Sequence, residues 1–386
     1  MDLQPLEKHS DITQLWLEKM LSIKMKSSIK VAFWSSTVPQ QREGFLSEIA
    51  FVKVQYTLPA NDEVQECKLV FKFLPQDPKL VQFLANGGLA EREVEFYQFV
   101  SSPDFQAICA KSGIDLPIPE VFFASFSDSA ITIVLRDLSM DQYKSVLIRD
   151  GSTLAQTKTA LRAMASIHGA GILYQHQHQE EGYLSSLAKE FSTDFYEQFF
   201  VPNMTAMAEM YRGTSLAEVF KALTSLTRHI RSTSMRHPLL KTVVHGDLWA
   251  GQLLYSADES LVSIIDWQFC HLDNPVGDIM SMFFMSTDPH VLEEHLEDIM
   301  QDYWAALCKV VQAGGGEVGV TFEQLMTNME EMWMYGFMFL VVSIHDFLGS
   351  DNISKKRLLG AFTFLEKRGV FAKFLAEFKN EGAEDL

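Results

Sequence analysis

The chain has 386 residues, of which 47% are hydrophobic and 21% charged, values typical of a folded globular protein. It carries 50 acidic and 32 basic residues, and its formal net charge of −18 disfavours nucleic acid or an anionic membrane as a partner. Four scattered cysteines indicate neither a disulfide framework nor a zinc site. No secretory signal is visible, and the longest apolar stretch, 332–344, is too short to span a bilayer, so we expect a cytoplasmic protein.

The first third of the chain combines helical and strand patterns. Apolar residues recur at helical spacing within 1–30 and alternate with period two from about 31 to 75. Strands are expected over 45–56, 67–74, 121–126 and 130–135. Asn86-Gly87-Gly88 predicts a turn from a strand into a helix over 89–101. After Asp137 the pattern is mainly helical, and two short apolar strands interrupt it near 243–268.

Two aspartates give the strongest chemical signal. Asp247 and Asp266 each adjoin a short apolar strand, and they lie 19 residues apart, about the length of one hairpin. Both carboxylates should therefore face one cleft. Phosphoryl transfer uses such a pair, one carboxylate to accept the hydroxyl proton and one to hold Mg²⁺. Gln252 follows Asp247 by five residues, where the kinase template has an amide ligand. Two unrelated turn acids would not explain this combination as well.

A kinase site also needs a lysine on a strand and a glutamate on the next helix. Lys72 interrupts an apolar strand, where an unpaired charge would be costly, so we prefer it to Lys68. On the following helix Phe96 marks the side that faces the core, and Glu93, three residues earlier, lies at the border of that side. The alternative for the lysine is a solvated strand edge, and for the glutamate a solvated helix face.

The expected phosphate-covering loop is poor in glycine. Only Gly44 occurs in 40–47, and alone it fits a simple turn equally well. Asp278, in the sequence 275–279, could cap the following helix or brace the loop that carries Asp247.

The pattern resembles the ecdysteroid kinase-like family, which belongs with the aminoglycoside and choline phosphotransferases. The resemblance covers about residues 35–350, and five segments carry it: 92–97, 134–138, 245–249, 264–268 and 275–279. It implies an α+β, two-lobed protein-kinase-like fold. Residues 1–136 would form the nucleotide-binding lobe with a small antiparallel sheet, and residues 137–386 a larger, mainly helical catalytic and substrate-binding lobe.

The resemblance also implies a role for each candidate residue. Asp247 would be the base, and Asp266 the main Mg²⁺ ligand with Gln252 beside it. Lys72 would contact the α- and β-phosphates and pair with Glu93. The remaining nucleotide contacts would come from the turn that holds Gly44 and Ser47, and from backbone groups of Arg136 to Leu138. Gln252 and Arg136 depart from the family's usual Asn and Glu.

We therefore expect an ATP-dependent phosphotransferase acting on a hydroxyl group of a small molecule, which could be ecdysteroid- or sterol-like, choline-like or a xenobiotic. Its metal would be Mg²⁺, with Mn²⁺ as an alternative suited to Gln252. The competing hypothesis is a pseudokinase that binds a nucleotide or ligand and acts as an interaction module. A protein kinase is disfavoured because neither Asp-Phe-Gly nor Ala-Pro-Glu follows Asp266. The sequence identifies neither the acceptor nor the oligomeric state.

Overall fold

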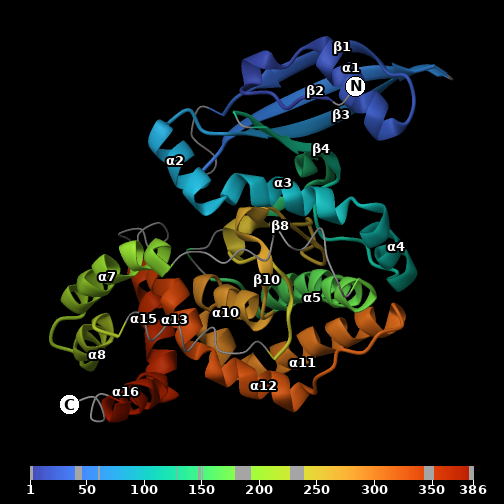
Figure 1. Ribbon diagram of the computed structural model, residues 1–386. Helices are drawn as coiled ribbons and strands as arrows, with labels where there is room; N and C mark the ends of the chain where they lie inside the picture. Colours follow the sequence, from blue (N-terminus) through green and yellow to red (C-terminus); the bar gives the residue numbers. More distant parts are fainter. Residues whose placement is uncertain are drawn as a thin grey trace.

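The computed structural model describes residues 3–39, 46–59, 61–127, 129–146, 149, 151–178, 193–226, 239–342 and 352–381. Figure 1 shows a strand-rich part that holds the N-terminus and a larger helical part below it, with α3 (Leu89–Val100) running between the two. The predicted α+β fold with an antiparallel sheet followed by a helical region is thus confirmed.

A five-stranded antiparallel sheet forms the strand-rich part. Its order is β1-β2-β3-β5-β4, with bounds β1 (Lys30–Thr37), β2 (Glu48–Leu58), β3 (Asn61–Phe73), β4 (Val121–Phe126) and β5 (Ile131–Arg136). Alternate residues of β2 are buried, as the period-two pattern predicted. The 3₁₀ helix η1 (His9–Asp11) precedes α1 (Gln14–Met25), and α1 packs on the sheet through Trp16, Leu17, Met20 and Leu21. No separate strand was predicted at β1, whose residues are mostly exposed because it is an edge strand.

The prediction of a strand-to-helix turn at Asn86-Gly87-Gly88 was wrong. A helix, α2 (Pro78–Gly87), precedes α3, so Gly88 joins two helices. The Asp77 side chain accepts a hydrogen bond from the Lys79 N–H, and Pro78 occupies the first helical position, a common helix start. Gly88 ends α2 with a φ of 59°, which glycine adopts without a side-chain clash.

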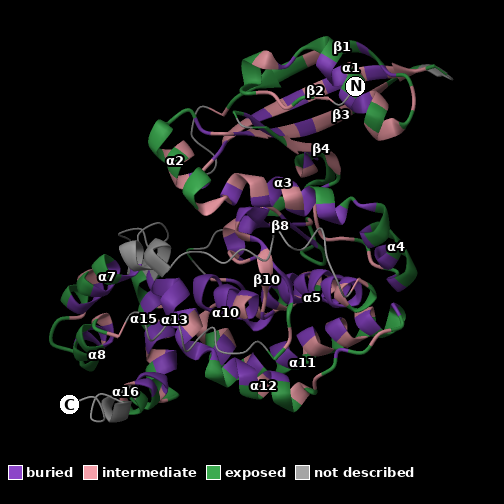
Figure 2. Cartoon of the chain, in the orientation of Figure 1, coloured by how far each residue is buried: buried purple, intermediate pink, exposed green. Residues whose placement is uncertain are grey.

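Helices dominate the rest of the described chain. They are α4 (Pro103–Ser112), α5 (Leu154–Gln177), α7 (Thr193–Met210), α8 (Ser215–Thr224), α10 (Val276–Met285), α11 (Pro289–Ala313), α12 (Phe322–Glu331), α13 (Trp333–Val342), α15 (Asn352–Lys367) and α16 (Val370–Glu381). Figure 2 shows that α10 is almost wholly buried in this part, and that α5 is mostly buried. Among the described helices, none is both long and apolar enough to cross a membrane.

Short strands and 3₁₀ turns lie beside the buried helices. One small sheet pairs β10 (His271–Asp273) with β7 (Thr242–Val244), and another has the order β6 (Lys144–Ser145), β8 (Leu253–Tyr255), β9 (Val262–Ile264). The 3₁₀ segments here are η2 (Leu138–Asp141), η4 (Ala250–Gln252) and η5 (Trp267–Phe269). The predicted strands within 243–268 are thus present. The proposed lobe boundary at 136 stays a prediction, since α3 and α4 share one core with α5.

Candidate active site

The turn after β7 carries Asp247, and Asp278 of α10 braces it. The Asp278 carboxylate accepts hydrogen bonds from the backbone N–H groups of His245, at 2.7 Å, and Gly246, at 2.9 Å. Burial opposes the charge of Asp278, but a hydrogen bond from His168 and the nearby imidazoles hold its pKa below the usual range. Of the two predicted roles, bracing fits, because Asp278 lies inside α10 and binds this turn.

Gly246 is required in this turn for two reasons. Its φ is 78°, in the left-handed region that favours glycine. A Cβ atom there would also lie 2.3 Å from the carbonyl oxygen of Phe269, far inside van der Waals contact. The glycine therefore lets the Asp247 turn approach the segment that follows Asp266.

His245 joins the two aspartate segments. Its Nε2 lies 2.9 Å from the carbonyl oxygen of Ile265, and its Nδ1 accepts the backbone N–H of Asp247 at 3.2 Å. These partners require a proton on Nε2 and a lone pair on Nδ1. Burial lowers the pKa of His245, which keeps the imidazole neutral. One ring thus fixes the spacing between Asp247 and the residue before Asp266.

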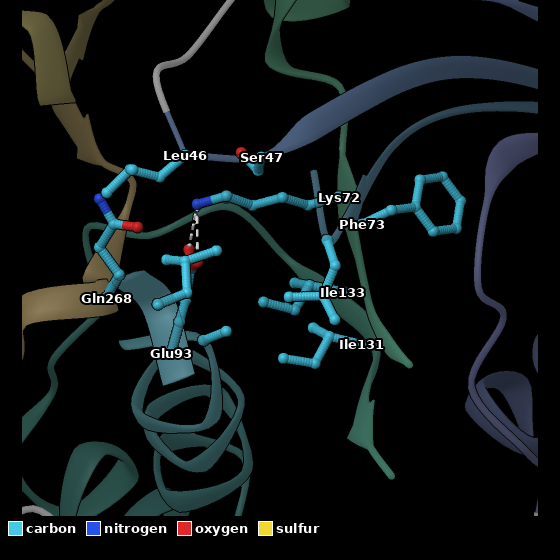
Figure 3. A pocket seen from close by; sticks show the side chains of 11 residues that line it. Leu46, Ser47, Lys72, Phe73, Glu93, Ile131, Ile133 and Gln268 are labelled. Atoms are coloured by element: carbon cyan, nitrogen blue, oxygen red, sulfur yellow. Dashed lines mark hydrogen bonds and ion pairs between the residues drawn. The ribbon is translucent and has the colours of Figure 1, made fainter. Parts of the chain in front are cut away.

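Lys72 lies between two carboxylates. Its Nζ is 2.9 Å and 2.6 Å from the two Glu93 oxygens (Figure 3), and it also forms an ion pair with Asp266. Burial alone would lower the pKa of Lys72, but the facing carboxylates of Asp266 and Glu93 raise it well above the usual range. The structure thus contains the predicted Lys72–Glu93 pair, held between β3 and α3.

Asp266 follows β9 in an uncommon backbone conformation. Its φ is 66°, a left-handed value rare for residues other than glycine and asparagine and often found at functional sites. Burial favours the protonated acid, but the charge and hydrogen bond of Lys72 hold the pKa of Asp266 below its usual range. The carboxylate is therefore ionised at neutral pH.

Gln252 links the two aspartates directly. Its Nε2 donates to Asp266 Oδ2 at 3.0 Å and to Asp247 Oδ2 at 3.4 Å. Both carboxylates thus lie within reach of one amide, as the hairpin spacing predicted. Burial and the nearby charge of Asp266 raise the pKa of Asp247 to about 7, against the hydrogen bonds from Gln252 and Trp249. The two carboxylates consequently differ in protonation behaviour although they share a donor.

A pocket lies beside the Lys72–Glu93 pair. Ser47, Lys72, Glu93 and Gln268 line it, together with apolar side chains from β5 and α2 that include Ile131, Ile133 and Leu84 (Figure 3). Ser47 thus lines the same pocket as Lys72, and its proposed place over the phosphates stays a prediction. Gly44, the other predicted residue of that turn, lies outside the described residues.

The predicted adenine-binding segment follows β5. The Arg136 side chain is exposed and pairs with Asp141 at 3.1 Å, so it points to η2 rather than to Lys72. The backbone N–H groups of Arg136 and Asp137 donate to the carbonyl oxygens of Glu120 and Lys68. Within the described part of the chain the Leu138 N–H has no hydrogen-bond partner. Of the predicted segment, Leu138 therefore offers a free donor.

Trp249 and Gln268 also contact the aspartates, although the sequence did not mark either as functional. The Trp249 indole Nε1 donates to Asp247 Oδ2 at 3.3 Å, and Gln268 Nε2 donates to Asp266 Oδ2 at 3.4 Å. Each residue stands two positions after the aspartate that it contacts. A search for hydrogen-bond donors close to each aspartate would have found both.

A model of the ecdysteroid kinase-like family matches residues 41–315, more than half of the chain. The chain belongs to this family. Membership places it among the small-molecule phosphotransferases. A search of curated proteins found no match.

Solved structures of low sequence identity align over most of the chain. Amicoumacin kinase hAmiN, in complex with AMP-PNP, Ca²⁺ and Ami, is 13% identical, with 93% of this chain and 96% of that chain covered and a TM-score of 0.46. The choline kinase LicA from Streptococcus pneumoniae is 13% identical, with 91% and 99% covered and a TM-score of 0.40. The GDP complex of an aminoglycoside 2′-phosphotransferase-IIIa mutant is 12% identical, with 96% and 99% covered and a TM-score of 0.44.

Proposed function

We propose that this member of the ecdysteroid kinase-like family transfers the γ-phosphoryl group of ATP to a hydroxyl group of a small molecule. The observation that carries the proposal is the pair Asp247 and Asp266, bridged by one amide, with the Lys72–Glu93 ion pair joined to Asp266. This arrangement offers one candidate for the base and one for the metal ligand within the same few ångströms.

Asp247 suits the role of general base. Its pKa of about 7 lies near neutral pH, where a general base can both accept a proton and release it again. In the proposed reaction the acceptor oxygen bonds to the γ-phosphorus as the bond to the bridging oxygen of ADP breaks. The hydroxyl proton passes to Asp247, which completes the balance.

The metal-binding residues would be Asp266 and Gln252. A carboxylate and an amide provide the oxygen ligands that Mg²⁺ prefers, and Mg²⁺ takes its other ligands from water and phosphate. The metal would supply charge neutralisation on the phosphates. Because the Gln252 nitrogen now faces both carboxylates, its amide must turn to present Oε1. No group of three or more His, Cys, Asp or Glu side chains in the described regions is arranged to hold a metal ion.

The nucleotide would lie between the sheet and the Asp266 segment. Lys72, held by Glu93, would contact the α- and β-phosphates, and the turn with Gly44 and Ser47 would cover them. The backbone from Arg136 to Leu138 would meet adenine, and the free Leu138 N–H supports that role.

The acceptor would be an ecdysteroid- or sterol-like compound, a choline-like compound or a xenobiotic. A chain with a net charge of −18 favours neutral or cationic acceptors over anionic ones. The proposed setting is the cytoplasm, where MgATP is available.

The test is ATP consumption by the purified chain over a panel of sterols, choline-like amines and phenolics. At least one acceptor should accelerate ADP release, with phosphate recovered on its hydroxyl group. Asp247→Asn should lower that turnover about 10²-fold or more, the usual scale for losing a general base. Equal turnover by wild type and Asp247→Asn would remove Asp247 from the mechanism.

The pseudokinase alternative rests on one observation, the orientation of Gln252. Its longer side chain places the amide nitrogen on both carboxylates, where the family's usual Asn has a shorter reach. If Gln252 only slows catalysis, Mn²⁺, which is larger and accepts similar oxygen ligands, should recover part of the rate. If no acceptor reacts with either metal and Gln252→Asn restores nothing, the chain is a nucleotide- or ligand-binding module.

A further inference from the structure

The Asp247 carboxylate is bound unevenly. Its Oδ2 accepts two hydrogen bonds, from Trp249 Nε1 at 3.3 Å and Gln252 Nε2 at 3.4 Å. In the described part of the chain Oδ1 has no hydrogen-bond partner. A carboxylate with one oxygen engaged presents its other oxygen in a defined direction. Oδ1 is therefore the oxygen left for an incoming hydroxyl group.

The two donors to Asp247 Oδ2 differ in whether they can remain bound when a metal ion is present. Gln252 must turn its amide to bind a metal, and its nitrogen then leaves Oδ2. The Trp249 indole has a donor and no acceptor, so it cannot make that exchange. With the metal in place, Trp249 would thus be the donor that stays on Asp247 among the residues that the structure describes.

Gly251 provides the space that the indole occupies. A Cβ atom at position 251 would lie 2.1 Å from the Trp249 ring, well inside van der Waals contact. The φ of Gly251 is not positive, so the backbone conformation would allow a side chain. The clash with the Trp249 ring is what excludes one. Any larger residue would displace the indole, and with it the Nε1 donor.

We propose that Trp249 is a positioning residue for the base: it holds Asp247 Oδ2 so that Oδ1 faces the acceptor, and Gly251 keeps its place open. The inference rests on the proposed function for its catalytic meaning, whereas the contact itself can be tested without any acceptor. A misplacement of about 1 Å at a reacting group can cost up to about 10²-fold in rate.

The contact is tested first by NMR on protein labelled with ¹⁵N-tryptophan. The Trp249→Phe variant identifies the Trp249 indole signal by its loss. Removing the acceptor in Asp247→Ala should move this signal and speed the exchange of its N–H proton, and Gly251→Ala should do the same. Asp273→Ala, a half-buried acid on β10, is the matched control and should leave the signal in place. A Trp249 signal that ignores Asp247→Ala overturns the proposal.

The catalytic consequence is tested by a double-mutant cycle, with MgATP and water as the default acceptor and the best acceptor of the panel where one reacts. Trp249→Phe, which keeps an aromatic ring but lacks the donor, should lower kcat about 10-fold with little change in the KM for ATP. In the Asp247→Ala background the same substitution should have no further effect, whereas a merely structural role would persist. Trp304→Phe on α11 controls for replacing a tryptophan.

The outcomes separate the two proposals. If wild type neither binds MgATP nor turns over while the indole still senses Asp247, the proposed function fails and the Trp249 contact stands. If wild type is active and Trp249→Phe is as active as wild type, the positioning role fails and the proposed function stands.

Discussion

The two candidate lysines on β3 have different partners in the structure. Lys72 binds Glu93 and Asp266, whereas the Lys68 backbone carbonyl accepts a hydrogen bond from the Asp137 N–H. We expect Lys72→Met to weaken MgATP binding at least about 10-fold, because it removes a charge from the proposed phosphate position. Lys68→Met is the matched control and should change the Kd little, as measured by isothermal titration calorimetry. Equal losses would mean that the nucleotide does not meet Lys72.

We expect Asp247, the proposed base, to lower the stability of the folded protein when it ionises. Its folded-state pKa of about 7 exceeds the ordinary aspartate value of 3.8, so ionising it in the folded protein costs free energy. The stability contributed by the neutral Asp247 side chain is fully present below pH 3.8, and it is lost as the pH rises through 7. Asp247→Asn cannot ionise, so it should be more stable than wild type at pH 8 by about 1–4 kcal/mol.

Chemical denaturation of both proteins at pH 5 and pH 8 measures this difference. The gain should be much larger at pH 8, and Asp141→Asn, a change to an exposed acid, should show no such trend. A gain of the same size at both pH values would show that hydrogen bonding rather than ionisation causes it.

Motif spacing was enough to find the residues that act in pairs. Asp247 with Asp266 and Lys72 with Glu93 were predicted because a hairpin or a strand–helix succession limits where each can lie. The direction of a side chain was not predictable in this way. Arg136 was expected to meet adenine through its backbone, and no sequence pattern indicated that its guanidinium pairs with Asp141. Trp249 likewise reaches Asp247 only because Gly251 leaves room for its ring.

At the scale of elements, Asp278 connects α10 to the loop before Asp247 and, through His168, to α5. Asp278→Asn keeps the shape but loses the charge and one acceptor oxygen. We expect it to lower the free energy of unfolding by about 2–4 kcal/mol, as for other broken buried networks. Thermal or urea unfolding measures the loss, and Asp298→Asn, on the exposed face of α11, is a control.

The same carboxylate sets an acid limit. The pKa of Asp278 is lower in the folded than in the unfolded chain, so its contribution is present above about pH 4 and is lost as the pH falls through the folded-state value. Wild type should lose stability below about pH 4 more steeply than Asp278→Asn. Parallel acid-unfolding curves would contradict this assignment.

The strands of the sheet were easier to predict than α2, the helix that precedes α3. β2, β4 and β5 alternate or form apolar runs, whereas α2 was hidden because its last residues, Asn86 and Gly87, look like a turn. Asp77 and Pro78 gave the helix-start signal that could have corrected this. β1 lies at an edge of the sheet with one buried residue, so it was covered only by the general period-two pattern and not predicted as a separate strand.

At the scale of the whole molecule, the candidate site lies between the sheet and the helical part. A ligand that binds residues from both parts stabilises the folded chain by mass action, by about 2.7 kcal/mol when its concentration is 100 times its Kd. MgATP should therefore raise the Tm of wild type. Asp266→Ala should abolish the rise, because it removes the proposed metal carboxylate.

Differential scanning fluorimetry with and without Mg²⁺ checks this. ATP without metal is the control for binding through Lys72 alone. A normal MgATP shift in Asp266→Ala would show that the metal is held elsewhere.

The ion pair between Lys72 and Asp266 joins residues 194 positions apart. A ribosome adds about 5–20 residues per second, so the lysine is made about 10–40 s before the aspartate. During that interval the sheet and α3 can already provide Glu93 as a partner, while the second carboxylate does not yet exist. The nascent chain therefore passes through a stage in which the lysine has one counter-ion instead of two. Synthesis itself gives the order in which this charge cluster is completed.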